Sequence, residues 1–423
     1  MRILYVSQYF PPEMGAPAAR VSQLACQWRR MGHDARVLTA FPHHPGGRIY
    51  PEYRERFRRG FLTEDYHGVP VYRTWLYPAA NRGVVLRSAG YASFLVSAAL
   101  RGWLLDFRPE IVIGTSPQLL CALAARWIAR RHRARFVFEV RDLWPDSLVA
   151  VNAATPDALL YRTLDAVARF LYRRAWKIVV LTDEFRRILL ERGIDPARLA
   201  VVKNGVDTGL FRPDCPAARR PELDGKFIVS YIGTLGMAHS VSTILDAAQL
   251  LSARPDIHFL IIGNGAEREH LLEQCRARRL DNLTFLGQQP WDAIPSHLTL
   301  SNAAIVHLAR SPLFRTVLPS KMFEIMAAGR PLVLGVEGEA ARLLDQAQAG
   351  LACEPQSPAD LSRAIARLAD DPALAARLGR NGRDYVVRHC SLPRRAAEYL
   401  EVLGAAPPAS TPPAEPVHDL AHG

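Results

Sequence analysis

Short apolar runs alternate with longer amphipathic segments through most of this 423-residue chain, and the alternation starts again near the middle. The apolar runs have the length of strands, and the segments between them have the length of crossover helices. This alternation is typical of parallel α/β sheets. We therefore expect an α/β protein with two Rossmann-like parallel-sheet domains that face an inter-domain cleft. Ligands of such sheets bind at the carboxyl ends of the strands.

The pattern predicts elements in both halves of the chain. In the first half we expect strands at Ile3–Val6, Ala35–Thr39, Val69–Arg73, Ile111–Gly114, Phe136–Val140, Ile178–Leu181 and Ala200–Val202, and helices near 17–31, 84–106, 118–132, 156–175 and 184–192. In the second half we expect strands at Phe227–Ile232, His258–Ile262, Leu283–Leu286, Ala304–Leu308 and Leu332–Leu334, and helices near 241–253, 267–279, 321–328, 338–347, 359–369, 373–382 and 393–403.

The domain boundaries follow from where this pattern pauses. A Pro-containing stretch from Phe211 to Pro221 has a composition that suits an exposed hinge. We expect an N-terminal domain over 1–205, a second domain over 206–385, and a C-terminal helix over 386–403 that packs back toward the first domain. The tail 404–423 is rich in Pro and Ala, which predicts disorder.

Charge is unevenly distributed between the two halves. Residues 1–205 hold 31 basic and 17 acidic side chains, a net charge of +14, whereas 206–423 hold 22 and 24. The first domain should therefore meet an anionic partner. Within it, the stretch 46–61 interleaves arginines with aromatic residues, which favours an anionic lipid surface. A solvated basic loop remains an alternative, and no nucleic-acid module accompanies the stretch.

Several classes of protein are disfavoured by what the sequence does not contain. The six cysteines are scattered without a C-x-x-C pair, which indicates a reducing cytosol and no structural metal. The apolar run Ser88–Leu100 is 13 residues long, shorter than the ~20 that a transmembrane helix needs. The sequence also has no P-loop motif.

Two glycine loops follow predicted strands. The first contains Glu13 and Gly15, and we expect it to present the carboxylate and backbone amides at the mouth of the first sheet. The second contains Gly263 and Gly265, a G-x-G that permits close approach of a ligand at the end of its strand. Both loops also fit plain strand-to-helix turns.

The stretch from Leu318 to Pro331 is the most informative one. Ser320 is expected to cap a helix whose first-turn amides, beside the Lys321 ammonium, form a site for a diphosphate. Glu324, one turn further, is expected to accept hydrogen bonds from vicinal ribose hydroxyls. The alternative makes Lys321 and Glu324 part of a solvated helix face.

A polar loop follows the strand that ends at Val140. Arg141, Asp142 and Trp144 at a sheet's carboxyl edge suit the binding of sugar hydroxyls, with the indole stacked on an apolar sugar face. A salt-bridged turn is the competing interpretation. The pair His43-His44 and the later His239 add imidazoles near the expected cleft, although single histidines are more often structural.

Taken together, these motifs resemble a known family. YFPPEMGAPAARV, FPHHPGGRIYPEYR, VRDLWPDS, VVKNGVDTGLFRP, YIGTLGMAHSV, IIGNGAER and PSKMFEIMAAGRP are similar to segments of glycosyltransferase family 4 (group 1), over about residues 2–400. Its members are retaining enzymes of the GT-B fold, and the likeness is greatest to WbuB-like members of O-antigen, capsule and exopolysaccharide assembly.

The resemblance implies roles for particular residues. It places Gly15 near the donor phosphates, Gly233, Gly236 and His239 beside the sugar diphosphate, Gly263 and Gly265 near the base, Lys321 at the phosphates and Glu324 on the ribose. The family's first Glu of an E-x7-E pair is Thr316 here, and its frequent basic pair in the first loop of the second domain is absent. Lys321 and Arg315 would then supply the positive charge.

The resemblance also implies an activity. We expect metal-independent transfer of a sugar from a UDP-type nucleotide sugar to a polyprenyl-diphosphate-linked glycan, at the cytoplasmic face of the inner membrane, with no cofactor. His239, Lys321 and Asp142 are the expected catalytic residues. Arg315, Thr316 and Ser320 join the donor site, and Glu13, Arg141 and Trp144 the acceptor site. The alternatives are a GT-B-fold nucleotide-sugar epimerase and a non-catalytic nucleotide-sugar-binding scaffold.

Overall fold

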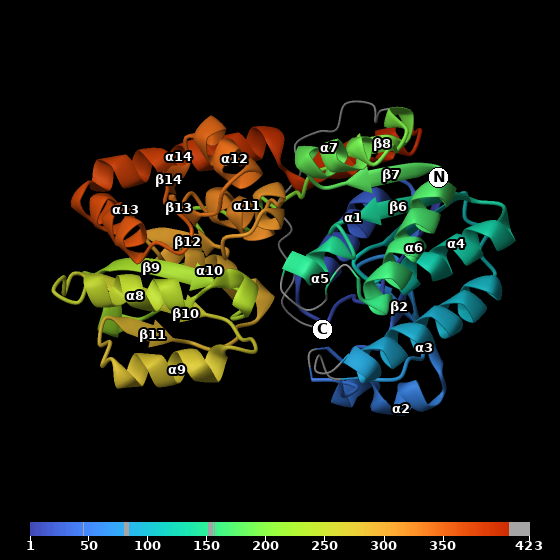
Figure 1. Cartoon of the computed structure of the whole chain (residues 1–423), viewed down its shortest axis with the longest axis horizontal. Coiled ribbons are helices and arrows are strands. Elements are labelled where there is room, and N and C mark those ends of the chain that lie inside the picture. Colours follow the sequence, from blue (N-terminus) through green and yellow to red (C-terminus); the bar gives the residue numbers. More distant parts are fainter. Residues whose placement is uncertain (45, 80–83, 151–154, 156, 406–423) are drawn as a thin grey trace. The chain divides into compact units, whose positions relative to one another are not determined.

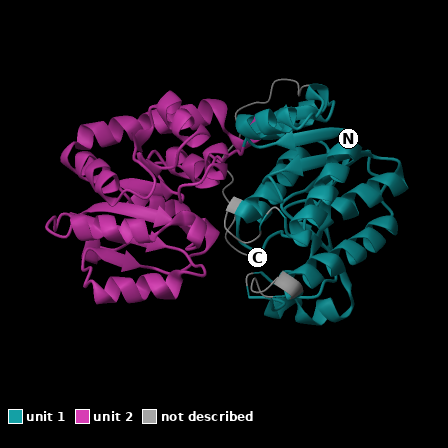
Figure 2. Cartoon of the chain, in the orientation of Figure 1, with its two compact units in different colours: residues 1–203, 395–410 teal, residues 204–394, 411–423 magenta. Residues whose placement is uncertain are grey.

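The computed structural model describes residues 1–44, 46–79, 84–150, 155 and 157–405. The chain forms two compact units (Figure 2). Met1–Lys203, together with the segment from Arg395 to Ala405, makes the first unit, and Asn204–Arg394 makes the second. Each unit is an α/β sheet covered by helices (Figure 1).

The first unit is built on an eight-stranded sheet of order β3-β4-β2-β1-β5-β6-β7-β8. Its strands are β1 (Arg2–Val6), β2 (Asp34–Ala40), β3 (Phe61–Tyr66), β4 (Val69–Thr74), β5 (Ile111–Thr115), β6 (Arg135–Val140), β7 (Lys177–Val180) and β8 (Leu199–Val201). All neighbours are parallel except the edge pair β3 and β4, which is antiparallel. The order reverses at β1, so the loops after β1 and β5 flank a topological switch point.

Helices cover both faces of this sheet. They are α1 (Ala16–Arg30), α2 (Arg54–Arg58), α3 (Val84–Trp103), α4 (Leu119–His132), α5 (Asp146–Ala150), α6 (Leu159–Arg174), α7 (Asp183–Glu191) and α15 (Leu392–Val402). Strand residues of one parity, such as Ile111 and Ile113, pack with α1 and α15. Gly114, of the other parity, lies against α4. The alternation of side chains along a strand therefore assigns α1 and α4 to opposite faces.

The C-terminal helix α15 is part of the core of the first unit. Ala396, Tyr399 and Leu400 are buried in the same cluster as Trp28 of α1. The Trp28 indole donates to the Ala396 carbonyl, and the Trp28 and Tyr399 rings meet edge to face at 5.2 Å. A chain segment nearly 200 residues away from β8 thus completes the first sheet's apolar layer. The tail expected over 404–423 lies, from 406 on, outside the described residues.

The second unit has a six-stranded, all-parallel sheet of order β11-β10-β9-β12-β13-β14. Its strands are β9 (Phe227–Ile232), β10 (Ile257–Ile262), β11 (Leu283–Phe285), β12 (Ala303–His307), β13 (Leu332–Gly335) and β14 (Gly350–Ala352). Its helices are α8 (Ser242–Leu250), α9 (Arg268–Ala277), α10 (Ile294–Leu300), α11 (Ser320–Ala327), α12 (Glu339–Ala347), α13 (Pro358–Asp370) and α14 (Pro372–His389). The strands β10 and β11 are added on one side of β9, and β12 to β14 are added on its other side. The switch point therefore lies between β9 and β12.

The predicted strands and long helices are confirmed, with ends that shift by a few residues. The sequence did not predict β3, β14, α2, α5 or α10, which are short or lie at a sheet edge. The expectation of an exposed hinge from Phe211 is wrong at its start, because Phe211 is buried in the core of the second unit. Among the described residues, no helix is both long and apolar enough for a membrane span.

Candidate functional site

A lysine from α11 lies over the carboxyl end of β9 in the second unit. The Lys321 Nζ donates to the Tyr231 hydroxyl at 3.3 Å and lies 4.4 Å from the centre of the Tyr231 ring. Gly233 follows β9 with φ of +152°, and a Cβ there would overlap the Lys321 Nζ. A glycine at 233 therefore leaves the space that the ammonium occupies. Lys321, expected from the sequence to bind phosphates, thus lies at the switch point of its sheet.

Burial shifts the pKa values of Lys321 and of the neighbouring Glu324. It lowers the pKa of Lys321 to about 8, against the opposing charge of Glu324. It raises the pKa of Glu324 to about 7, with Lys321 acting in the other direction. An anion bound here would meet an ammonium that is poorly solvated, which strengthens the attraction.

His239 joins the same cluster from the 3-10 turn that follows β9. Its ring lies 6.5 Å from that of Tyr231. Its Nδ1 is buried with no hydrogen-bond partner among the described residues. Burial first, and the Lys321 charge second, lower the pKa of His239 to about 3. The imidazole is therefore neutral at neutral pH.

The loop that carries His239 is held by His307, at the end of β12. His307 Nδ1 donates to the His239 carbonyl at 2.9 Å, and Nε2 accepts from the Gln356 backbone N–H at 3.0 Å. These two bonds fix one neutral tautomer, and burial lowers the pKa of His307. Sequence reasoning treated His307 as an ordinary strand residue, because its position in an apolar run gives no sign of this bridging role.

The helix α11 begins differently from the sequence expectation. Ser320 is its first residue and Pro319 its N-cap, and no side chain caps the helix. The expectation that Ser320 is the cap is therefore wrong, because the serine already has helical geometry. Without a capping side chain, the N-terminal end of α11 next to Lys321 keeps the partial positive charge that favours anions.

The G-x-G after β10 serves the packing of two loops. A Cβ at Gly263 would overlap the Gly233 carbonyl, and a Cβ at Gly265 would overlap the Leu235 carbonyl. Gly233 N–H donates to the Ile262 carbonyl, and Leu235 N–H to that of Asn264. Both glycines thus permit close approach of the loop after β9, which the spacing alone could not distinguish from approach of a ligand. By contrast, a Cβ at Gly236 would meet only Thr234, at 3.7 Å.

Arg315 and Thr316 lie on a neighbouring part of the second unit. Arg315 is mostly exposed and lines a hollow beyond β12 and β13, with its Nε 3.7 Å from the Glu337 carboxylate. Thr316 is buried and its hydroxyl donates to the Leu313 carbonyl at 2.6 Å. The Thr316 side chain closes a 3-10 turn, and its hydroxyl is already engaged.

In the first unit, Glu13 organises the loop after β1. Its Oε1 accepts the backbone N–H groups of His43 and His44, both at 2.9 Å. Glu13 is 3% exposed, and burial raises the pKa of its carboxyl to about 7 despite these bonds. Gly15 follows with φ of +133° and stands at the N-cap of α1 without a capping side chain. Both residues thus lie at the mouth of the first sheet, as expected.

Arg141, Asp142 and Trp144 follow β6 on one loop. The Arg141 Nε donates to the Ser116 carbonyl at 3.0 Å, and its Nη1 donates to that of Pro17 at 3.2 Å. Burial raises the pKa of Asp142 to about 6, while Arg141 lowers it. All three side chains keep partial exposure. Arg141 therefore ties the switch-point loops of the first unit together beside a carboxyl that titrates near neutrality.

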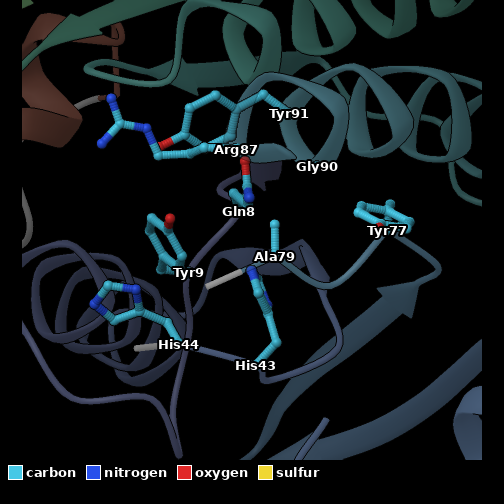
Figure 3. A pocket seen from close by; sticks show the side chains of 9 residues that line it. All are labelled: Gln8, Tyr9, His43, His44, Tyr77, Ala79, Arg87, Gly90 and Tyr91. Carbon is cyan, nitrogen blue, oxygen red and sulfur yellow. The ribbon is translucent and has the colours of Figure 1, made fainter. Parts of the chain in front are cut away.

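A hollow opens beside Glu13 at the ends of β1, β2 and β4. Figure 3 shows the side chains of Gln8, Tyr9 and His43 gathered around it. His43 Nδ1 donates to the Phe41 carbonyl, and burial lowers the pKa of His43 to about 4. The Gln8 Oε1 is buried without a hydrogen-bond partner among the described residues. The residues that line the hollow are Gln8, Tyr9, His43, His44, Tyr77, Ala79, Arg87, Gly90 and Tyr91. Sequence reasoning singled out only the two histidines.

The aromatic residues of the basic stretch 46–61 are mostly engaged within the unit. Phe57 meets Phe41 edge to face at 5.4 Å, and the Arg73 guanidinium lies 4.8 Å from the centre of the Tyr53 ring. The Tyr50 hydroxyl donates to the His44 carbonyl. The five arginines of the stretch are exposed: Arg48, Arg54, Arg56, Arg58 and Arg59.

One mainly parallel and one wholly parallel α/β sheet, each with polar groups at its switch point, define a protein of the GT-B class. Two family models match in succession: the glycosyl transferase 4-like domain over residues 15–205 and the glycosyl transferases group 1 over residues 217–385. The chain belongs to the group 1, family 4 glycosyltransferases, enzymes that transfer a sugar from a nucleotide sugar.

Curated relatives agree with this assignment, and a solved structure agrees with the fold. The chain is 26% identical to WcaI of Escherichia coli K12, named a colanic acid biosynthesis glycosyl transferase, over 80% of this chain and 84% of WcaI. It is 29% identical to the glycosyltransferase WbjE of Pseudomonas aeruginosa, over 68% of this chain and 74% of WbjE. The crystal structure of Anabaena HepE with UDP matches at a TM-score of 0.68 and 15% identity, over 96% of this chain and all of HepE.

Proposed function

We propose that the protein is a retaining, metal-independent glycosyltransferase of surface polysaccharide assembly. It would move a sugar, an N-acetylated amino sugar or a deoxysugar, from a UDP-type donor to a polyprenyl-diphosphate-linked glycan at the cytoplasmic face of the inner membrane. The observation that carries this proposal is the Lys321 ammonium held over Gly233, at the switch point of the second sheet.

The site around Lys321 would have to stabilise the nucleoside diphosphate that leaves during sugar transfer. When the bond from the sugar to the β-phosphate breaks, negative charge grows on a phosphate oxygen. A fixed ammonium and an uncapped helix N-terminus stabilise that charge without reorganising, as oxyanion sites do. The neutral His239 imidazole can hydrogen-bond the same diphosphate or the sugar, and Glu324 would accept from the ribose hydroxyls.

We propose roles for the remaining expected residues as well. Gly236 would leave its loop open for the diphosphate, and Gly263 and Gly265 would shape the loop that faces the base. Gly15 would approach the donor phosphates. Arg315 would add positive charge beside Thr316 and Ser320.

For the acceptor we propose the first unit, with Arg141, Asp142 and Trp144 at the sugar. Asp142 has a raised pKa and could take part in proton transfer from the acceptor hydroxyl. Glu13 would act by holding the backbone of His43 and His44 rather than by touching the sugar, because its Oε1 is already engaged.

The names of relatives support the biological setting. WcaI is named for colanic acid biosynthesis, and HepE was crystallised with UDP. The decisive experiment incubates the protein with labelled UDP-sugars and a bacterial lipid extract, after a thermal-shift screen of nucleotides selects the donor. Transfer of label to lipid, lost in Lys321→Ala, is the expected result. Failure of any nucleotide to raise the melting temperature would refute the proposal.

A second candidate function is a non-catalytic scaffold that binds a nucleotide sugar. Thr316 favours it, because members of the family commonly carry Glu at that position. A scaffold would bind the nucleotide sugar and turn over none of it with any acceptor. An epimerase would instead convert the nucleotide sugar in the absence of lipid, which product analysis detects.

A further inference from the structure

The helices α3 and α4 of the first unit carry large apolar side chains that nothing in the described chain covers. On α3 and just after it, Val96, Leu100, Trp103 and Leu104 are exposed, Leu104 to 73%. On α4, Trp127 is 53% exposed. A soluble surface seldom gathers two tryptophans and two leucines without a partner.

These residues form one patch, because α3 and α4 pack directly on each other. A Cβ at Gly102 would overlap the side chain of Ile128, so the helices meet closely at the residues next to Trp103 and Trp127. His132 of α4 bonds the Gly102 carbonyl at 2.9 Å. Figure 1 shows the two helices side by side. The patch is Val96, Leu100, Trp103, Leu104 and Trp127.

Arginines lie next to this patch at the end of α4. Arg130, Arg131 and Arg133 at the end of α4 are exposed, and no ion pair is recorded for any of them within the described parts of the chain. The Arg131 guanidinium lies 5.4 Å from the centre of the Trp103 ring. A cation thus stands directly beside the apolar surface, as in proteins that bind at the level of lipid headgroups.

A fourth arginine beside the patch, Arg126 of α4, has no carboxylate partner within the described residues. The Arg126 Nε is buried with no partner among the described residues. Burial and the neighbouring charges of Arg174 and Arg130 lower the pKa of Arg126. Neighbouring like charges disfavour one another's charged form, and a bound anion would relieve that effect. The surface around the patch therefore favours the binding of an anionic group.

We infer that the patch on α3 and α4 docks on an anionic lipid bilayer, with Trp103, Trp127 and the leucines in the interface and the arginines at phosphate headgroups. The inference rests on the proposed function, whose acceptor is lipid-linked, and it assigns the contact to α3 and α4 rather than to the stretch 46–61. A two-fold contact with a second copy of this chain would set Arg130 and Arg131 against the same arginines, which is repulsive.

The test measures partition of the full-length protein onto vesicles. Wild type should bind vesicles of phosphatidylcholine with phosphatidylglycerol and bind phosphatidylcholine alone far less. The pair Leu100→Ser and Leu104→Ser should lower partition by about tenfold or more, because two exposed leucines no longer leave water. The pair Arg130→Gln and Arg131→Gln should remove most of the preference for the anionic lipid.

A matched control is Leu250→Ser. Leu250 is the last residue of α8 in the second unit and is 59% exposed, and its replacement should leave partition unchanged. Brominated lipids should quench tryptophan fluorescence of wild type more than that of Trp103→Phe with Trp127→Phe.

Three results would overturn the inference: no partition of wild type, partition of the leucine variant equal to wild type, or loss of partition that follows the loss of a dimer in light scattering. UDP binding is measured on every variant by calorimetry. Vesicle binding without UDP binding would refute the proposed function alone, and UDP binding without vesicle binding would refute the docking surface alone.

Discussion

The Lys321 Nζ lies 3.3 Å from the Tyr231 hydroxyl, and that hydroxyl in turn donates to the Thr234 carbonyl at 2.8 Å. A strand residue thus links the ammonium from α11 to the loop after β9. Because the same Tyr231 hydroxyl accepts from the lysine and donates to the loop, movement of the loop and movement of the lysine are coupled through one side chain.

Lys321→Ala is expected to lower the rate of sugar transfer by about 10²- to 10³-fold, the usual effect of losing one group that stabilises a developing oxyanion. It should not lower the free energy of unfolding, because burial already disfavours the ammonium in the folded state. Transfer kinetics and urea unfolding measure the two effects.

Lys226 provides the control for that variant. It is another lysine of the second unit and precedes β9, at the opposite end of the strand from Gly233. Lys226→Ala should transfer sugar at the wild-type rate. Equal activity of the two alanine variants would remove Lys321 from the phosphate site.

The affinity for UDP should depend on pH through Lys321. Its pKa is lowered to about 8 in the free protein, and a bound diphosphate favours the charged form. Affinity should therefore be insensitive to this group below pH 8 and decline above it, by up to about tenfold per pH unit. Calorimetry of wild type and Lys321→Met between pH 7 and 9 checks this, since the methionine variant should show no such decline.

Gly233→Ala is expected to destabilise the second unit, because φ of +152° is unfavourable for alanine and the added Cβ overlaps the Lys321 Nζ. Gly236→Ala is the matched comparison in the same loop, with an open site and negative φ, and should leave the unfolding midpoint nearly unchanged. Combining Gly233→Ala with Lys321→Ala should restore part of the lost stability. A double variant no more stable than Gly233→Ala would show that backbone strain alone matters.

The sequence predicted the order of elements well because apolar periodicity directly reports which residues are buried. It predicted the place of Lys321 through its position near the start of a helix after β12. It could not predict the partner of that lysine, because Tyr231 is a strand residue in an apolar run and only the tertiary fold brings the two side chains together.

Capping and edge structure were harder to predict. Ser320 precedes an apolar helical run, as an N-cap does, yet the preceding Pro319 takes the extended cap geometry. The edge strand β3 alternates exposed and partly exposed side chains, so its pattern lacks a buried face. The hollow around Gln8 depends on three loops from separate strands, and no local sequence signal joins them.

A buried ion pair should determine the stability of the first unit. The Arg20 guanidinium of α1 donates to the Glu139 carboxylate of β6 at 3.1 Å and to the Val202 carbonyl at 3.2 Å, and Glu139 also accepts from Tyr5. Burial acts to raise the pKa of Glu139, but Arg20 and Arg141 hold it below its usual range. Arg20→Met would remove the only guanidinium that hydrogen-bonds this buried carboxylate among the described residues and leave it with Tyr5 as donor and the more weakly acting charge of Arg141, at a cost of about 3–5 kcal/mol.

A second substitution distinguishes the effect of losing the ion pair from the effect of losing the packing around it. Glu139→Gln added to Arg20→Met removes the unpaired charge and should recover much of the lost stability. Because the Glu139 carboxyl of the single variant would no longer be held ionised by Arg20, its loss of stability should be smaller at pH 5 than at pH 8. Urea unfolding at both pH values measures this. A single variant equally destabilised at the two pH values would mean that lost packing, not the uncompensated carboxylate, accounts for the effect.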